Sequence, residues 1–218
     1  MAGHTLIDIM VADDHELVRT GISRMLSDIE DINVSGQAAS GEDAVNLYRT
    51  LIPDVVLMDF RMPGIGGLEA TRKICQIDPN ARVIVVTSCI EDPFPSKLME
   101  AGAHGYVTKS ANISEMVQAI RSVFSGTKYI SPEIAQKLAL QAVSPIEGSP
   151  FSQLSHREMQ IALMIVGCEK VQIISDKLCL SPKTVNSYRY RMFEKLDITS
   201  DVELTHLAIR YKLVESVA

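Results

Sequence analysis

The chain has 218 residues, a formal net charge of −6 and 46% hydrophobic residues. This length suits two small domains, and the composition supports folded cores and excludes a mainly disordered protein. The first residues carry no basic stretch of the kind that opens a secretory signal peptide. The longest apolar runs are too short to span a bilayer. We therefore expect a cytoplasmic protein that does not enter a membrane.

Charge is divided unevenly along the chain. Residues 1–140 carry 18 acidic and 12 basic side chains, whereas residues 151–218 carry 8 acidic and 9 basic ones. Within the second part, residues 181–195 hold four basic side chains against one acidic. A local concentration of cations favours contact with a polyanion such as nucleic acid. The four cysteines form no CxxC pair and lie among apolar neighbours, so we expect reduced structural thiols.

The first half of the chain alternates short apolar runs with segments of helical spacing. The runs are strand-length and rich in β-branched residues, and the segments between them carry apolar stripes and capping residues. A repeated strand–helix order predicts an α/β fold, in which a parallel sheet is doubly wound by helices on both faces. The predicted strands are 6–12, 32–39, 54–59, 82–87 and 104–108, and the predicted helices are 15–27, 41–51, 66–77, 95–102 and 112–124.

Beyond residue 125 the pattern changes. Residues 125–141 allow one more helix, and the Pro- and Ser-containing stretch after them has no apolar period. The rest of the chain has helical spacing throughout, with predicted helices at 155–167, 170–178, 181–196 and 201–212. We therefore expect an α/β domain at 1–125, a linker with one helix at 126–153, and an all-α domain at 154–218.

Chemically useful side chains follow the predicted strands of the first domain. Asp13 and Asp14 end the first strand, Asp59 ends the third, Thr87 ends the fourth, and Lys109 follows the fifth. In an open parallel sheet the carboxyl ends of the strands form the functional edge. Three carboxylates gathered there repel one another, and the usual remedy is a divalent cation. An all-oxygen ligand set favours Mg²⁺.

A carboxylate beside a cation and a lysine can act as a nucleophile. Asp59 could attack a phosphoryl group and form an aspartyl phosphate, while Lys109 and the Thr87 hydroxyl bind the transferred oxygens. The Pro-Gly turn after Asp59 would present a backbone carbonyl, that of Arg61, to the metal. An aspartate-nucleophile phosphatase is the alternative enzyme class. Such enzymes usually carry a second Asp two residues after the nucleophile, and Arg61 occupies that position.

The stretches VADDHE, LMDFRMPG, VVTS and GYVTKSA, in this order and spacing, resemble the receiver domain of two-component response regulators over roughly residues 1–125. The resemblance implies a (βα)5 flavodoxin-like fold and a sensor histidine kinase, or its phosphotransfer domain, as phosphodonor. It also implies roles for six side chains: Asp59 as phosphoacceptor, Lys109 as the charged partner of Asp59, Asp13 and Asp14 as the acidic Mg²⁺ site, Thr87 as switch hydroxyl, and Tyr106 as the rotating aromatic.

Two departures from the receiver pattern concern its switch region. Ser110 stands where many receivers have a proline, which usually follows a cis bond. Pro93 and Pro95 lie where the fourth helix should begin, and proline is tolerated in a first helical turn but not beyond it. We therefore expect that helix to start late or irregularly.

The stretch SPKTVNSYRYRMFEKL predicts an amphipathic helix. Ser181 and Pro182 make a strong helix start. Val185, Tyr188, Met192 and Leu196 predict a buried stripe. A second face carries Lys183, Asn186, Ser187 and Tyr190, flanked by Arg189 and Arg191. Such a face suits the major groove of DNA, since Asn can read adenine and cations can hold phosphates. With the preceding helix it would form a helix-turn-helix, although a merely solvated face remains the alternative.

Residues 154–215 resemble the four-helix module of LuxR/NarL-type regulators. The resemblance implies base or groove contacts by Lys183, Asn186, Ser187 and Tyr190, and backbone contacts by Thr184, Arg189 and Arg191. It makes Glu158 an internal polar anchor and the last helix a dimer contact.

The stretches EDPFPSK and SPKTVNSYRYR carry a narrower resemblance, to the GacA/UvrY subgroup of these regulators. That subgroup implies a membrane hybrid kinase as donor and small regulatory RNA genes as targets. We therefore expect a phosphorylation-dependent transcription regulator, not an enzyme, which dimerises to bind double-stranded promoter DNA. An interaction adaptor whose helix-turn-helix no longer binds DNA is the rival within this class.

Overall fold

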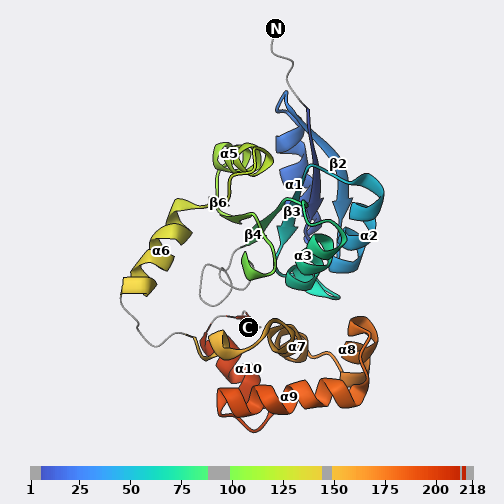
Figure 1. The fold of residues 1–218 in the computed structure, drawn as a ribbon, viewed down its shortest axis with the longest axis vertical. Coiled ribbons are helices and arrows are strands. Elements are labelled where there is room, and N and C mark those ends of the chain that lie inside the picture. The colour runs from blue at the N-terminus through green and yellow to red at the C-terminus, as the bar shows by residue number, and fades with distance from the viewer. Residues whose placement is uncertain (1–5, 88–98, 144–148, 212, 215–218) are drawn as a thin grey trace. The chain divides into compact units, whose positions relative to one another are not determined.

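The computed structural model describes residues 6–87, 99–143, 149–211 and 213–214. The chain forms two compact units, which are drawn in Figure 1. Among the described residues, the second unit comprises those from Val143 onward. No helix in the described ranges is both long and apolar enough to cross a bilayer.

The N-terminal unit is built on one sheet of six parallel strands, in the order β2-β1-β3-β4-β5-β6. The chain winds outward from β1 in both directions, so the doubly wound parallel fold expected from the sequence is confirmed. The strands are β1 Ile7–Ala12, β2 Ile32–Ala38, β3 Val55–Asp59, β4 Val83–Thr87, β5 Gly105–Thr108 and β6 Tyr129–Ile130.

The apolar runs of the sequence become strands that are buried on both faces. Ile9 and Val11 belong to the core cluster shared with the helices of one face. The alternate residue Met10 is also fully buried, because successive side chains of a strand point to opposite faces. Every residue of β3 and β4 is buried. A charged residue at the end of β3 is therefore carried to the sheet edge by a strand that packing fixes on both sides.

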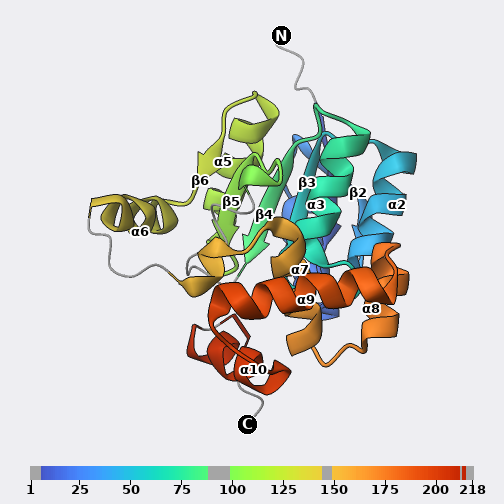
Figure 2. The same ribbon diagram turned by 60° about the horizontal axis from the view of Figure 1, so that its bottom comes forward.

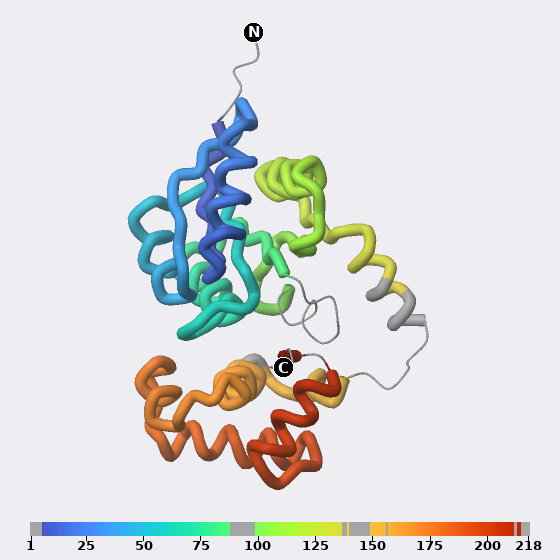
Figure 3. The backbone as a smooth tube through the Cα atoms, turned by 180° about the vertical axis from the view of Figure 1, so that it is seen from behind, coloured from blue at the N-terminus to red at the C-terminus, as the bar shows by residue number. Residues whose placement is uncertain are grey.

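Helices cover both faces of this sheet (Figures 1 and 3). α1 and α5 pack on one face, and α2 and α3, which contact each other, cover the other. The Ser40 hydroxyl caps α2 and the Asn112 side chain caps α5. Half of the predicted helix at 95–102, including Pro95, lies outside the described residues, as does Pro93. The described helices are α1 Glu16–Ser27, α2 Gly41–Leu51, α3 Gly66–Ile77, α5 Ile113–Phe124 and α6 Pro132–Val143.

The strand β6 was not expected from the sequence, and it lies in the stretch that the sequence placed in the linker. Its Ile130 pairs with Tyr106 of β5, and the amide of Ser131 donates to the Tyr106 carbonyl at 2.9 Å. The Ser131 hydroxyl donates to Glu115 of α5 at 2.5 Å. The segment before α6 is thus attached to the sheet. A run of two strand residues is too short to give a period-2 signal in the sequence.

The described residues of the C-terminal unit form helices and no strand, as the sequence predicted (Figure 2). Ser181 caps the longest of its helices, and Ser155 and Glu158 form a reciprocal capping box at α7. Its elements are the 3₁₀ turn η1 Pro150–Gln153 and the helices α7 His156–Val166, α8 Val171–Leu178, α9 Pro182–Leu196 and α10 Asp201–Arg210.

The buried stripe of α9 differs in one position from the prediction. Val185, Met192 and Leu196 are buried as predicted, but Tyr188 is only half-buried and Phe193 is buried instead. At about 100° per residue, Tyr188 is rotated by roughly 60° from Val185, which puts it at the edge of the stripe. Its ring lies under the Arg191 guanidinium, with 6.0 Å between them.

Candidate functional site

The carboxyl ends of β1 and β3 bring two buried aspartates together. Asp13 follows β1 and Asp59 ends β3, the strand paired with it, and each residue is 2% exposed. The Lys109 ammonium lies between them, with Nζ 2.7 Å from Asp13 Oδ2 and 2.8 Å from Asp59 Oδ2. Lys109 reaches this point because its amide donates to the Thr87 carbonyl at 2.8 Å, which continues the β4–β5 pairing past the strand ends.

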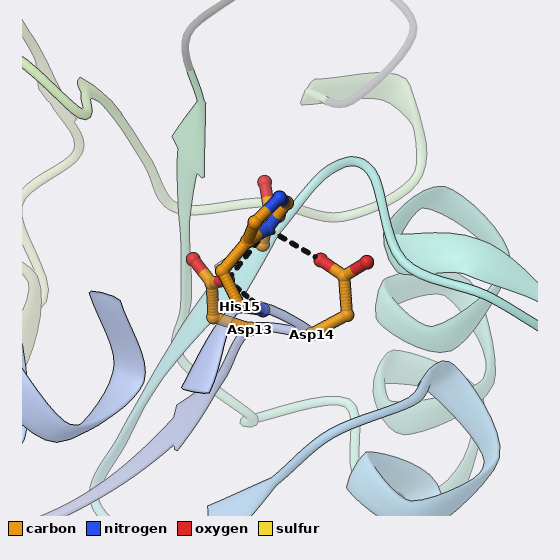
Figure 4. Close-up of side chains that lie close together, drawn as sticks. Asp13, Asp14 and His15 are labelled. Carbon is orange, nitrogen blue, oxygen red and sulfur yellow. Dashed lines mark hydrogen bonds and ion pairs between the residues drawn. The ribbon is translucent and has the colours of Figure 1, made fainter. Parts of the chain in front are cut away.

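Asp14 and His15 complete the cluster on its exposed side (Figure 4). His15 Nδ1 lies 2.9 Å from Asp14 Oδ1, and the His15 amide donates to Asp13 Oδ1 at 2.8 Å. The potential ligand atoms of Asp13, Asp14, His15 and Asp59 all lie within 4.8 Å of one another. The sequence reasoning did not single out His15. Its only signal was its position directly after the two aspartates.

The donors of this cluster fit Mg²⁺. Three carboxylates face a single ammonium, so the cluster has an excess of negative charge that a divalent cation would balance. Two of the carboxylates are fixed by burial, and Asp14, with its side chain 31% exposed, leaves the site open toward solvent. Hard oxygen donors with room for water are what Mg²⁺ takes.

The same geometry sets the protonation of the two central groups. Burial raises the pKa of Asp59 to about 6, against the opposing effect of the Lys109 ammonium. Burial by itself works to lower the pKa of Lys109, but its hydrogen bonds to Asp13 and Asp59 outweigh this and leave the pKa raised. Lys109 is therefore a fixed positive charge, and Asp59 is ionised at neutral pH at an energetic cost.

The loop between β3 and α3 folds tightly around Asp59. The Arg61 amide donates to Asp59 Oδ1 at 3.3 Å, and the Gly67 amide donates to the Phe60 carbonyl at 3.1 Å. A Cβ on Gly67 would lie only 2.0 Å from the Asp59 carbonyl oxygen. Only glycine therefore fits at position 67, where the first turn of α3 passes the backbone of Asp59, the phosphoacceptor candidate. The Arg61 carbonyl, predicted as a metal ligand, belongs to this loop.

Thr87 and Tyr106 lie on neighbouring strands and are both inside the protein, with exposures of 1% and 0%. At Ser110, where many receivers have proline, the hydroxyl is hydrogen-bonded to the Thr108 hydroxyl at 2.9 Å. The amide of Ala111 donates to the Thr108 carbonyl at 3.1 Å, so a tight turn follows Lys109. This turn supports the position of the lysine.

A second candidate site lies on α9 of the C-terminal unit. A surface groove of about 290 Å³ runs along the helix, lined by Lys183, Thr184, Ser187, Tyr188 and Arg191. The spacing of these residues follows one face of a helix. The predicted contacts Asn186 and Tyr190 do not line this groove. Tyr190 is 68% exposed, which is unusual for so large an aromatic side chain.

Arg189 lies differently from the other basic residues of α9. Its guanidinium makes two hydrogen bonds to the Asp201 carboxylate of α10, at 2.7 and 2.6 Å, and lies over the Phe193 ring. In this arrangement Arg189 joins α9 to α10. Near the C-terminal end of α9, Lys195 Nζ lies 2.6 Å from Glu158, which is buried, so the predicted internal anchor has a partner on α9.

The fold and the two sites together indicate a class of protein in which a doubly wound domain with an acidic pocket is joined to a helix-turn-helix domain. Two family profiles match the chain, "Response regulator receiver domain" over residues 9–121 and "Bacterial regulatory proteins, luxR family" over residues 152–208. The chain therefore belongs to the two-component response regulators of the NarL/FixJ type, which are phosphorylation-dependent transcription regulators.

Among individual proteins, the chain is 64% identical to the response regulator GacA of Pseudomonas aeruginosa over 98% of its length and all of that protein. It is 57% identical to the response regulator UvrY of Escherichia coli over 95% of its length and 96% of that protein. A solved LuxR-family response regulator from Aurantimonas, 43% identical, matches 64% of this chain and all of that one with a TM-score of 0.62.

Proposed function

We propose that this response regulator accepts a phosphoryl group on Asp59 and that this controls DNA binding through α9. The observation that carries the first half is the Lys109 ammonium held between Asp13 and Asp59, at 2.7 and 2.8 Å. This places a buried carboxylate next to a fixed cation at the open end of a sheet, where an incoming phosphoryl group can be met.

The proposed transfer is a nucleophilic displacement. An Asp59 carboxylate oxygen forms a bond to phosphorus, and the phosphorus–nitrogen bond of the donor histidine breaks. The histidine keeps the bonding electron pair and takes up a proton. Lys109 then turns from Asp59 to a phosphoryl oxygen, and the Thr87 hydroxyl donates to another. Tyr106, already buried in this structure, is the aromatic that we expect to respond to the movement of Thr87.

Mg²⁺ would be held by Asp13, Asp14, Asp59 and the Arg61 carbonyl, and would supply positive charge for the phosphoryl oxygens. The protein's own contribution is to hold the carboxylates together and to keep Lys109 protonated through its two hydrogen bonds.

For the C-terminal unit we propose that α9 enters the major groove of promoter DNA. The exposed Lys183 and Arg191 lie along one groove of the helix surface, as phosphate or base contacts require. The proposed base or groove contacts are Lys183, Asn186, Ser187 and Tyr190, and the proposed backbone contacts are Thr184, Arg189 and Arg191. For Arg189 the proposal requires that DNA phosphate replace the Asp201 carboxylate.

The partners and setting follow from the family and from the relatives. We propose a sensor histidine kinase, of the hybrid type, or its phosphotransfer domain as donor, and a homodimer as the DNA-bound form. From the resemblance to the GacA/UvrY subgroup we further propose small regulatory RNA genes as targets, with this protein as activator, and a cytoplasmic location. We further propose residues 1–125 as the receiver, 126–153 as linker and 154–218 as the DNA-binding domain.

The test is to treat the full chain with a small-molecule phosphodonor and Mg²⁺ and to measure the intact mass. We expect a mass gain of one phosphoryl group in the wild type and none in Asp59→Asn.

The same samples are then titrated with a duplex selected from a random-sequence pool by the phosphorylated protein. Phosphorylation should raise its affinity. Equal labelling of Asp59→Asn would contradict the assignment of the acceptor, and sustained release of phosphate from a small phosphoester, with many turnovers, would favour a phosphatase.

A further inference from the structure

The loop that follows Asp59 is held from outside by a residue of another helix. Glu42 is the second residue of α2, and its Oε1 accepts a hydrogen bond from the Ile65 amide at 3.1 Å. Ile65 is buried and directly precedes α3. Because a backbone amide at the end of a loop cannot shift without losing such a bond, Glu42 fixes the far end of the β3–α3 loop.

The packing around this bond is unusually close. A Cβ on Gly64 would lie 1.9 Å from Glu42 Oε2, so only glycine lets the carboxylate sit against the turn. Gly64 also has a φ of +79°, a conformation that glycine adopts at little cost. A Cβ on Gly41, the first residue of α2, would meet the Ile65 side chain at 2.7 Å and the Gly66 carbonyl at 2.8 Å. The start of α2 and the loop are thus in backbone-level contact.

The near end of the same loop is fixed by Asp59 itself. Arg61 donates its amide to Asp59 Oδ1, and Gly67 donates its amide to the Phe60 carbonyl. The peptide of Arg61 therefore lies in a loop that is pinned at one end by the acceptor carboxylate and at the other by Glu42. Groups that orient a metal-binding element typically matter for metal affinity nearly as much as the ligands do.

We propose that Glu42 is a positioning residue for the phosphorylation site: it holds the β3–α3 loop so that its backbone carbonyl can reach the metal. This rests on the proposed function of the Asp13, Asp14 and Asp59 pocket. The role of Glu42 is that of a hydrogen-bond acceptor rather than of a charge, so an amide in its place preserves it.

The experiment uses the full chain and three variants: Glu42→Ala, which removes the acceptor; Glu42→Gln, which keeps an acceptor without the charge; and Asp43→Ala, which removes the exposed neighbouring carboxylate of the same helical turn. Hydrogen exchange of the peptide that contains Ile65 is measured without metal, and Mg²⁺ affinity is measured by calorimetry with Mg²⁺ alone. Thermal unfolding checks that all variants fold.

We expect Glu42→Ala to speed exchange at Ile65 and to weaken Mg²⁺ binding about tenfold. Glu42→Gln should retain most of both properties, and Asp43→Ala should match the wild type. Unchanged exchange or unchanged Mg²⁺ affinity in Glu42→Ala would overturn the proposal, as would a Gln variant as weak as the Ala variant. A wild type that takes up neither Mg²⁺ nor a phosphoryl group would instead refute the proposed function of the pocket.

Discussion

At the scale of single residues, the molecule buries charged side chains, which costs stability, and pairs them with specific partners. Asp59 is buried at the end of a wholly buried strand, and Lys109 compensates only part of the cost of its charge, since the pKa of Asp59 is raised to about 6. Such a carboxylate is destabilising in the metal-free protein, and the proposed phosphoryl transfer would make use of it. At Asp59, the requirement for a stable fold therefore opposes the requirement for a reactive carboxylate.

The first prediction concerns the pH dependence of that cost. A carboxyl whose pKa is raised on folding makes the unfolding free energy fall as pH rises from its ordinary value near 4 to about 6, after which the loss is constant. Asp59→Asn should therefore be more stable than the wild type by about 3 kcal/mol at pH 7.5 in EDTA, and the difference should shrink to near zero below pH 4. Urea unfolding of the N-terminal unit measures this.

The control for Asp59→Asn is Asp43→Asn, which neutralises an exposed carboxylate and should change stability little at either pH. A destabilised Asp59→Asn at pH 7.5 would show that the ion pair with Lys109 outweighs the burial of the carboxylate.

At Glu158 we expect the opposite pH dependence: the unfolding free energy should rise, not fall, as the pH rises. Burial works to raise its pKa, but the Lys195 ammonium and the Ser155 backbone amide and hydroxyl hold the pKa below its ordinary value. The stability that this carboxylate contributes is present above pH 4.5, the ordinary value, and is lost as pH falls through the lowered folded-state pKa.

Glu158→Gln should destabilise the C-terminal unit by about 1–3 kcal/mol at neutral pH, because it weakens a capping box and an ion pair that is partly screened at Lys195. The loss should shrink in acid. The midpoint of helix unfolding by circular dichroism is the measurement, and Glu194→Gln, an exposed acid next to Lys195, is the matched control. Equal effects of the two variants would rule out a specific anchoring role for Glu158.

At the scale of elements, helix starts are fitted closely to the strand ends they follow. Gly67 shows this best, because α3 passes the Asp59 carbonyl at a distance that excludes any Cβ. Gly21, in the middle of α1, has no atom within 4 Å of the position that a Cβ would take, and so shows the ordinary case of a helical glycine. Close packing therefore requires glycine at position 67 of α3 but not at position 21 of α1.

Replacing each of these glycines by Ala should have opposite effects. Gly67→Ala should destabilise the N-terminal unit by about 1–3 kcal/mol, since the methyl group forces α3 away from β3. Gly21→Ala should stabilise it by roughly 0.5–1 kcal/mol, since Ala loses less backbone entropy in a helix. Denaturant midpoints of the two variants measured side by side test the pair. A neutral Gly67→Ala would mean that the loop around Asp59 adapts freely.

The DNA contacts proposed for α9 are of two kinds, which can be distinguished by their salt dependence. Arg191→Ala should weaken binding to a selected duplex and lower the slope of log affinity against log salt by about 1, as the loss of one phosphate contact requires. Asn186→Ala should weaken binding without changing the slope, because an amide that reads a base releases no counterion. A titration at several salt concentrations checks both. Identical slopes for wild type and Arg191→Ala would remove Arg191 from the phosphate contacts.

At the scale of the whole molecule, the chain consists of two units with separate cores. Hydrophobic residues of β1, α1 and α5 form one cluster, and Phe151, Met192 and Leu204 are among the buried residues of the helical unit. Because each unit buries its own apolar residues, each should unfold as its own cooperative transition.

Calorimetry of the full chain should therefore resolve two transitions. Gly67→Ala should shift only one of them and Glu158→Gln only the other, and the double variant should show the sum of the two effects to within about 0.5 kcal/mol. A single transition that both substitutions shift would show strong coupling between the units.

The sequence by itself determined the elements and most of the chemistry at their ends. Strands such as β3 are apolar runs, and helices such as α2 and α9 begin at Ser caps, so both follow from local periodicity and local hydrogen bonding. The positions of Asp13, Asp59 and Thr87 at strand ends followed from the same patterns, since parallel strands share one functional edge.

Only the tertiary structure decided which of these residues touch. Lys109 binds Asp13 as well as Asp59, Arg189 pairs with Asp201 instead of lying free on α9, and Glu42 holds a loop that begins after β3. The short strand β6 likewise forms only because β5 offers it an edge. Such contacts leave no periodic trace, because they depend on how distant segments close on one another and not on the local preference of any one of them.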